Sequence, residues 1–256
     1  MPNSANQIGN PSAKNLMTSA GKLGLAVVLG LSALQTQAVT APDDGGKSKN
    51  LQASEGRRQF EIWEREYAKK TDSKPPNMEK ALRALKRSAE LEDPEGLEDW
   101  ALYFNWPDLW PDKPEQYAYR FRLLKRAVEL GNVDANVGLG LAYGFGQGVA
   151  RDPGMYAYHQ CVAKRAGNES ARRNLEFSTA GEHAEFARIS LQEPVLFRVR
   201  ADKKAGGITY LRVGQEAWEV ADYNDGWTAV YLPEGCVVGF VETIDLKKAR
   251  AAPTGD

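Results

Sequence analysis

The middle of the chain repeats itself, and this repetition limits the possible fold more than any other feature. The segment Leu85–Leu91 (LKRSAEL) matches Leu124–Leu130 (LKRAVEL) at an offset of 39 residues. A second match, between 127–135 and 163–171, has an offset of 36 residues. Repeats of this length typically form pairs of helices that stack into an array. The sequence therefore predicts units made of a helix, a loop, a second helix and a short break.

The residues at the breaks suit the ends and starts of helices. Asp93 and Asp152 each precede a proline, which is typical of an N-cap followed by the first helical turn. Gly131 and Gly167 suit the left-handed conformation that ends a helix, and the asparagine after each glycine can cap the next one.

The best-preserved unit covers residues 135–171, and its loop reads YGFGQGVARD over Tyr143–Asp152. This unit resembles the Sel1-like repeat, a relative of the tetratricopeptide repeat. The residues that carry the resemblance are Tyr143, Gly146, Gly148, Val149 and Asp152. The resemblance implies an α-helical Sel1-like repeat solenoid over 56–192, with one well-preserved repeat and one or two diverged ones. Capping helices are expected near Gln59–Tyr67 and Ala171–Leu191.

The pattern changes after Pro194, where β-forming residues alternate or cluster between turns rich in Gly, Asn and Asp. The predicted strands are Val195–Val199, Ile208–Val213, Trp218–Tyr223, Trp227–Leu232 and Val237–Val241. Five short strands predict a small barrel. The motifs Gly226-Trp227, Val230–Gly235 and Gly239–Val241 resemble the bacterial SH3-like domain. The predicted fold is thus multidomain, α then β, with an SH3-like β-barrel over 193–248 and a tail at 249–256.

The N-terminal segment has the pattern of an export signal. Lys22 precedes the apolar run Leu23–Leu34, and small residues at Thr36 and Ala38 suit a signal peptidase. As a helix the run spans about 18 Å, short of the ~30 Å hydrocarbon core. We therefore expect a cleaved signal peptide over 1–38 and no stable membrane insertion after cleavage.

Three further expectations follow from this signal. The mature protein begins at Val39, and residues 39–55 form a flexible linker, because they are polar and lack apolar periodicity. The protein is periplasmic or secreted. The start codon encodes either Met1 or Met17, since the segment after Met17 is the more compact signal.

The sequence carries no pattern typical of a catalytic or metal site. Its two histidines are His159 and His183, and the spacing of histidines and cysteines does not suit a metal. His159 occupies an inward repeat position, which favours a packed structural role. The glycines of residues 144–148 are not followed by Lys-Ser/Thr, and no strand precedes them, so nucleotide binding is disfavoured. We expect no enzyme activity, no cofactor and no metal.

The net charge of −1 gives no bulk electrostatic reason to bind nucleic acid or anionic membranes. Aromatic residues of the predicted barrel, Tyr223, Trp227 and Tyr231, are candidates for a ligand groove. The alternative is that Trp227 covers the barrel or docks it on the helices.

The predicted function is an exported interaction or scaffold module of the bacterial cell envelope. The repeat groove would bind a partner protein, and the SH3-like domain a peptide or peptidoglycan. The alternative is a periplasmic immunity-type inhibitor of a secreted toxin.

Cys161 and Cys236 are the two cysteines, and export places them in an oxidising compartment that favours pairing. A bond between them would clamp the barrel against the second helix of the best repeat. The alternative is two independent residues, with Cys161 in a helix seam and Cys236 at a turn. In the paired interpretation both side chains are expected to face outward.

Overall fold

A computed structural model describes residues 44–68, 77–103, 114–180, 184–204 and 207–250 of the chain. The predicted signal peptide over 1–38, its cleavage site and its start codon lie outside the described residues. The residues from Asp43 onward form one compact unit.

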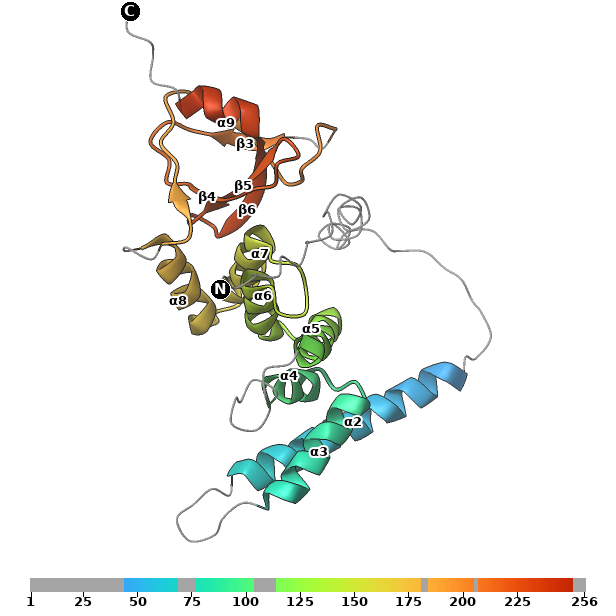
Figure 1. The fold of residues 1–256 in the computed structure, drawn as a ribbon. Helices are drawn as coiled ribbons and strands as arrows, with labels where there is room; N and C mark the ends of the chain where they lie inside the picture. The colour runs from blue at the N-terminus through green and yellow to red at the C-terminus, as the bar shows by residue number, and fades with distance from the viewer. Residues whose placement is uncertain (1–43, 69–76, 104–113, 181–183, 205–206, 251–256) are drawn as a thin grey trace, which may run out of the picture. The chain divides into compact units, whose positions relative to one another are not determined.

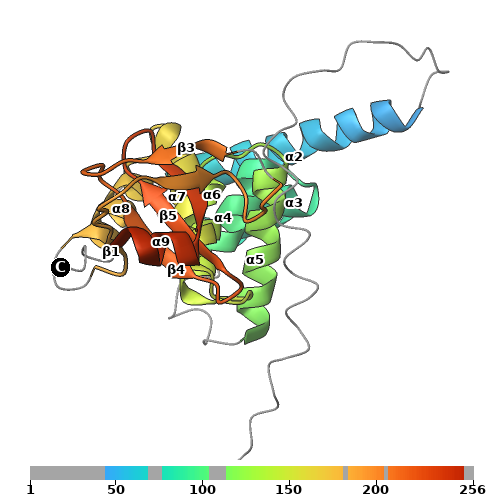
Figure 2. The same cartoon turned by 90° about the horizontal axis from the view of Figure 1, so that it is seen from above.

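Among the described residues, seven helices form the first part of this unit, and helices that follow one another along the chain pack together (Figure 1 and Figure 2). They are α2 (Asp44–Ala68), α3 (Met78–Glu90), α4 (Pro94–Tyr103), α5 (Pro114–Glu129), α6 (Ala135–Phe145), α7 (Pro153–Arg165) and α8 (Glu169–Thr179). In the repeat units α2, α4, α6 and α8 are first helices, whereas α3, α5 and α7 are second helices. The predicted helical repeat array is therefore confirmed.

The same hydrogen-bond pattern ends the second helix of each repeat, which is α3, α5 or α7. The bonds run from the Asp93 N–H to the Ser88 carbonyl, from Asn132 to Ala127 and from Asn168 to Ala163, at 3.1, 3.0 and 3.0 Å. The residue before each donor is left-handed: φ is 60° at Glu92, 97° at Gly131 and 94° at Gly167. These are Schellman ends, and they recur at the offsets of 39 and 36 residues found in the sequence. The predicted left-handed glycines are confirmed, and Glu92 takes the same conformation without being glycine.

The donor residue of each Schellman end also starts the next helix. Side-chain oxygens of Asp93, Asn132 and Asn168 accept hydrogen bonds from backbone N–H groups in the first turns of α4, α6 and α8. Asp152 does the same for α7 by accepting from the Met155 N–H at 3.0 Å. At Asp93, Asn132 and Asn168 a single residue thus closes one helix with its backbone N–H and begins the next with its side chain, which keeps the breaks short.

The expected flexible linker over 39–55 is wrong from residue 44 onward, because α2 already begins at Asp44. Phe60 is buried and anchors this helix in the core shared with α3. Residues 49–54 are exposed and extend the same helix by further turns. Once a packed segment has nucleated a helix, adding polar residues to its end costs little free energy. Their lack of apolar periodicity reflects exposure, not the absence of a helix.

The second part of the unit is an antiparallel sheet in the order β1-β4-β5-β6-β2-β3. Its strands are β1 (Ala187–Arg188), β2 (Val195–Arg198), β3 (Gly207–Leu211), β4 (Trp218–Asp222), β5 (Trp227–Leu232) and β6 (Val237–Glu242). The five predicted strands match β2 to β6. The sheet does not close into the small barrel that was expected, because β1 and β3 form separate edges and do not pair. Helix α9 (Thr243–Arg250) contacts β2 and β6 and buries Leu246 and Ala249 in the sheet's core.

Two boundaries also differ from expectation. The capping helix expected over Ala171–Leu191 ends at Thr179, and the chain then forms β1. Phe186 and Leu191 in this stretch are buried in the two cores that flank the sheet, so tertiary packing overrides continuation of the helix. Ala249 and Arg250, which were expected to begin the tail, belong to α9, and the rest of the expected tail lies outside the described residues.

Candidate interaction surface

The sheet packs directly on the repeat array, and α7 supplies most of the contact. Tyr156 and Cys161 of α7 share one apolar core with Ala229 and Tyr231 of β5. On the other side of the strand, Val230 and its neighbours face the core that α9 covers. All six residues of β5 are buried. The sheet therefore covers a face of α7 that would meet solvent in a free-standing array.

This packing decides where the aromatic candidates lie. Tyr231 is 2% exposed, and burial raises the pKa of its phenol to about 12. Trp227 is 8% exposed at the start of the same strand. These two side chains do not form the open ligand groove that the sequence suggested as one possibility. Tyr231 packs in the core shared with α7, and Trp227 is buried at the start of β5.

Tyr223, the third aromatic candidate, lies at the end of β4 and reaches the start of α7. Its hydroxyl donates a hydrogen bond to Oδ1 of Asp152 at 2.7 Å. A side chain at Gly154 would collide with this hydroxyl, so glycine is required for the approach. Burial and the Asp152 carboxylate both raise the pKa of the Tyr223 phenol. Tyr223 therefore contributes to packing between the two parts of the chain.

Cys161 and Cys236 are joined by a disulfide, with their α-carbons 5.3 Å apart. The expectation that they face outward is wrong, because Cys161 is 2% exposed and Cys236 is 3% exposed. The equivalent positions of the two earlier repeats are Lys125 and Lys86, and both are exposed. Here the sheet lies over Cys161, and the bond crosses the apolar core between α7 and the β5–β6 turn.

The residues of the loop 143–152 that were singled out in the sequence have structural roles. Gly146 ends α6 with φ of 69°, and Gly148 has φ of 76°. A side chain at Gly148 would collide with the Tyr117 carbonyl of α5. Val149 is half-buried, and the Asp152 N–H donates to the Tyr143 carbonyl at 2.9 Å. These contacts shape the turn between α6 and α7.

His159 is a packed side chain, as predicted. It is 7% exposed, its ring stacks on Tyr143, and its Nδ1 lies 2.8 Å from Oδ1 of Asn136. Burial lowers the pKa of His159 to about 4, so the ring is neutral at physiological pH.

The first helices of the repeats lie in a row, and side-chain hydrogen bonds connect each of them to the next. Trp63 of α2 donates to Asp99 of α4 at 2.8 Å. The side-chain amides of Asn132 and Asn168 donate to Glu98 and Asp134, each at 2.7 Å. The order along the row is therefore α2, α4, α6 and α8, and we call this set the first-helix row.

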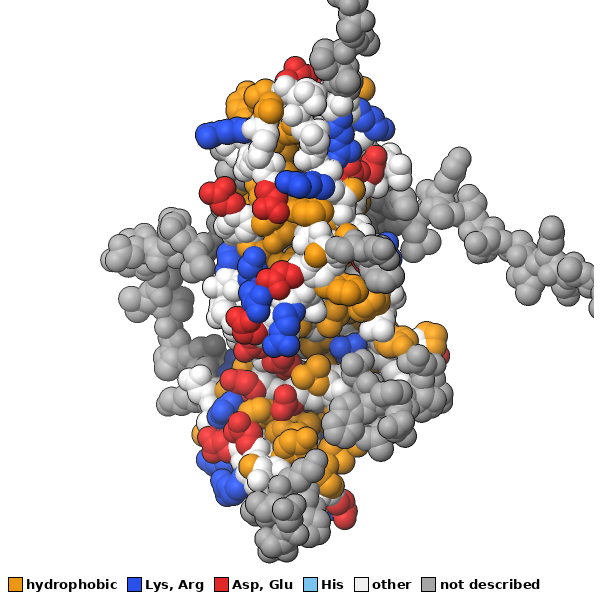
Figure 3. All heavy atoms as spheres, turned by 90° about the vertical axis from the view of Figure 1, so that its left-hand side faces the viewer, with side chains coloured by type: hydrophobic (Ala, Val, Ile, Leu, Met, Phe, Trp, Pro, Cys, Tyr) orange, Lys and Arg blue, Asp and Glu red, His pale blue; other side chains and the backbone are white. Residues whose placement is uncertain are grey.

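Large apolar side chains recur on this row at equivalent positions. Leu102 of α4, Leu141 of α6 and Phe177 of α8 are separated by 39 and 36 residues, the same offsets as the helix ends. Leu102 is 40% exposed, Phe177 is 64% exposed and Leu141 is half-buried. We call these three residues the exposed row. Figure 3 shows hydrophobic patches among mixed charges on one side of the molecule.

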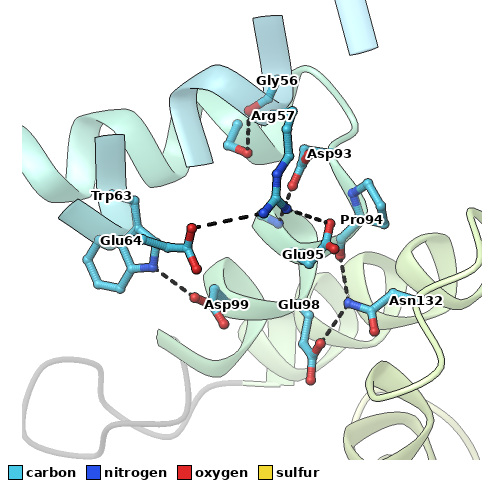
Figure 4. Close-up of polar contacts among 12 residues, drawn as sticks. Gly56, Arg57, Trp63, Glu64, Asp93, Pro94, Glu95, Glu98, Asp99 and Asn132 are labelled. Atoms are coloured by element: carbon cyan, nitrogen blue, oxygen red, sulfur yellow. Dashed lines mark hydrogen bonds and ion pairs between the residues drawn. The ribbon is translucent and has the colours of Figure 1, made fainter. Parts of the chain in front are cut away.

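We call a group of neighbouring carboxylates the acidic cluster, and Figure 4 labels all of its members except Asp134. Its members are Glu64, Glu95, Glu98, Asp99 and Asp134. Arg57 lies among them, 3.2 Å from Glu95 and 3.9 Å from Glu64. Burial raises the pKa of Glu98 and of Asp99, and the neighbouring carboxylates raise both further.

Sequence reasoning missed both the exposed row and the acidic cluster. The offsets themselves were a usable signal, because they align Leu102 with Leu141 and Phe177. The acidic cluster had no such signal, since it combines residues of α2, α4 and the start of α6. Within the described ranges no group of three or more His, Cys, Asp or Glu residues could hold a metal ion. Among the same residues, no helix is both long and apolar enough to cross a membrane.

No protein-family model and no curated protein sequence matches the chain. Among solved structures it is similar to a Sel1 repeat protein from Oxalobacter formigenes, with 25% identity and a TM-score of 0.39, over 52% of this chain and 97% of that one. It is also similar to Helicobacter pylori cysteine rich protein B, with 18% identity and a TM-score of 0.35, over 51% and 99%.

A third similar structure is a protective antigen of uropathogenic Escherichia coli that displays an SLR fold. The identity is 19% and the TM-score 0.41, over 54% of this chain. The chain spans only 28% of that antigen's length.

Proposed function

We propose that this chain is a protein–protein interaction module of the bacterial cell envelope, and that it binds its partner along the first-helix row. The observation that carries the proposal is the exposed row. Leu102 and Phe177 hold large apolar surface in solvent at equivalent positions of successive repeats. Apolar side chains aligned in this way mark a surface that another molecule covers. Repeat arrays use such extended surfaces to bind along several units at once.

Export to the envelope is the second part of the proposal. Disulfides persist in oxidising compartments such as the periplasm and are rare in the bacterial cytosol. A buried Cys161–Cys236 bond supports such a location, as does the signal-like segment before Val39. We do not extend the proposal to peptide or peptidoglycan binding by the sheet, because Trp227 and Tyr231 are buried.

The experiment is crosslinking and pull-down from envelope extract with three proteins. These are the natural chain, a Leu102→Ser/Phe177→Ser variant, and a Tyr210→Ser/Val213→Ser control in β3 and the turn after it. Tyr210 and Val213 are 57% and 55% exposed, so the control removes similar exposed apolar surface elsewhere. We expect a partner that the natural chain and the control capture and that the first variant loses.

The identity of the captured partner then separates two roles. A structural or enzymatic envelope protein supports a scaffold, whereas a tight one-to-one complex with a toxin supports an immunity-type inhibitor. Equal capture by all three proteins, with circular dichroism showing each to be folded, would overturn binding along the first-helix row.

A further inference from the structure

Three carboxylates of the acidic cluster lie on the same face of α4 as Leu102, the residue of the exposed row on this helix. Glu95, Glu98 and Asp99 lie seven, four and three residues before Leu102. On a helix these spacings place the four side chains on the same side. A molecule that covers Leu102 must therefore also meet the acidic cluster.

The positions of two carboxylates of the acidic cluster are explained by the helices themselves. Glu95 and Asp134 lie at the starts of α4 and α6, where the helix dipole favours a negative charge. Glu98 and Asp99 lie further along α4 and have no such reason. They accept hydrogen bonds from neutral donors, Asn132 and Trp63.

The charge of Glu98 and Asp99 is not balanced within the described residues. Neither carboxylate forms an ion pair there with a lysine or arginine, and Asp134 forms none either. Arg57 pairs with Glu64 and Glu95. On α8, by contrast, Arg172 pairs with both Glu169 and Glu176. The raised pKa values of Glu98 and Asp99 have the same origin, since burial and neighbouring carboxylates both oppose ionisation.

We propose that the first-helix row binds a cationic segment of a partner protein, in which arginine or lysine side chains alternate with apolar ones. The cations pair with Glu98, Asp99 and Asp134, while the apolar side chains cover Leu102, Leu141 and Phe177. This inference rests on the proposed function and specifies the chemistry of the partner. Arginine suits these sites well, because its planar fork binds a carboxylate through two hydrogen bonds.

Charge complementarity selects this occupant over other polymers. A nucleic acid or an anionic lipid would bring phosphates next to Glu98, Asp99 and Asp134, which are themselves negative, and this costs free energy. A cation supplied by a partner would instead neutralise carboxylates that this part of the chain leaves unpaired. The same pairing would favour a partner carrying cations over one of equal apolar area without them.

The test is fluorescence anisotropy with the purified full chain and two labelled peptides. One peptide alternates arginine with leucine, and the other replaces each arginine by aspartate. We expect the arginine peptide to bind and the aspartate peptide not to bind. Glu98→Gln/Asp99→Asn should weaken binding of the arginine peptide by about tenfold or more, because partly desolvated charge pairs dominate dissociation. Added salt should weaken binding to the natural chain more than binding to this variant.

A matched control removes the same charge elsewhere. Glu193→Gln/Glu234→Gln changes two exposed carboxylates in the sheet region and should leave binding within about twofold, since isolated exposed charges contribute little. Weaker binding by Glu98→Gln/Asp99→Asn should not result from unfolding. The substitutions remove mutually repelling carboxylates, so the thermal midpoint of the variant should not fall.

The outcomes separate this inference from the proposed function. If the Leu102→Ser/Phe177→Ser variant loses the envelope partner but Glu98→Gln/Asp99→Asn keeps it at full affinity, the cationic chemistry is overturned and the interaction surface stands. Equal binding of the arginine and aspartate peptides would also overturn the cationic chemistry. If none of these changes affects partner capture, the proposed function fails as well.

Discussion

The hydroxyl of Tyr223 lies 2.7 Å from Oδ1 of Asp152 and joins the end of the fourth strand to the residue that starts α7. Asp152 uses the same oxygen to accept from the Met155 N–H, so one carboxylate oxygen caps the helix and holds the sheet. Asp152, at the end of the loop between α6 and α7, thus also holds the sheet against the repeat array.

Replacing Tyr223 with Phe should destabilise the protein by about 1–3 kcal/mol, because it removes a hydrogen bond to a charged acceptor in a half-buried place. Urea unfolding measures the change. Tyr210→Phe, at an exposed position of β3, is the control and should change stability by less than about 0.5 kcal/mol. Equal stability of both variants would show that Tyr223 does not dock the sheet on α7.

The two loop glycines should differ in their sensitivity to substitution. Gly146→Ala should cost about 1 kcal/mol, since only the positive φ opposes it. Gly148→Ala should cost more, about 2–4 kcal/mol, because the added carbon also collides with the Tyr117 backbone. Thermal unfolding of the two variants measures the order. Similar costs at both positions would contradict the close approach of this loop to α5.

Much of the fold could be predicted from the sequence because it depends on short-range rules. Gly131 and Gly167 end helices through a local conformational preference, and alternation of apolar residues located β2 to β6. What covers each face depends on the tertiary fold. The alternation in β5 separated Tyr231 from Val230, but both faces are buried, one by α7 and the other by α9.

The same limit explains the cysteines and the candidate site. Cys161 occupies a position that faces solvent in a regular repeat, and only the docked sheet buries it. The acidic cluster joins residues of α2, α4 and α6, which no local pattern brings together. Leu102, Leu141 and Phe177 were within reach of sequence reasoning, because the repeat offsets align them.

Acidification should destabilise the protein through His159. Its pKa is lowered to about 4 in the folded chain, whereas the unfolded value is near 6.5. The stabilisation is therefore fully present above pH 6.5 and is lost as the pH falls from 6.5 towards 4, when only the unfolded chain binds the proton. The expected loss is about 3 kcal/mol.

The comparison for this prediction is His159→Gln, followed by urea unfolding across the same pH range. The readout is the slope of stability against pH, because the substitution also changes packing. Raised pKa values at Glu98 and Asp99 act in the opposite direction, but they act equally in both proteins. Parallel slopes would mean that His159 does not titrate as a buried neutral ring.

Glu92 takes a left-handed conformation where the other two repeats have glycine, and it also pairs with Arg126 at 2.9 Å. Glu92→Gly should relieve about 1 kcal/mol of backbone strain. It should also lose an exposed ion pair of about 0.2–1 kcal/mol, so the net change is close to zero. In an Arg126→Ala background only the relief remains, and the same substitution should be stabilising. A double-mutant cycle by urea unfolding tests this difference, and destabilisation in both backgrounds would exclude strain at Glu92.

The Cys161–Cys236 bond should contribute strongly to stability, because it closes a loop with a sequence separation of 75 residues. The chain-entropy model gives about 4 kcal/mol for such a loop. Cys161→Ala/Cys236→Ala should lose this amount of stability in urea unfolding, and the natural chain under reducing conditions should lose the same amount.

Cys236 also has a φ of 48°, which favours glycine. Cys161→Ala/Cys236→Gly should therefore be about 1 kcal/mol more stable than the double-alanine variant. Two free thiols per chain in unfolded, unreduced protein from the envelope would show that the bond does not form.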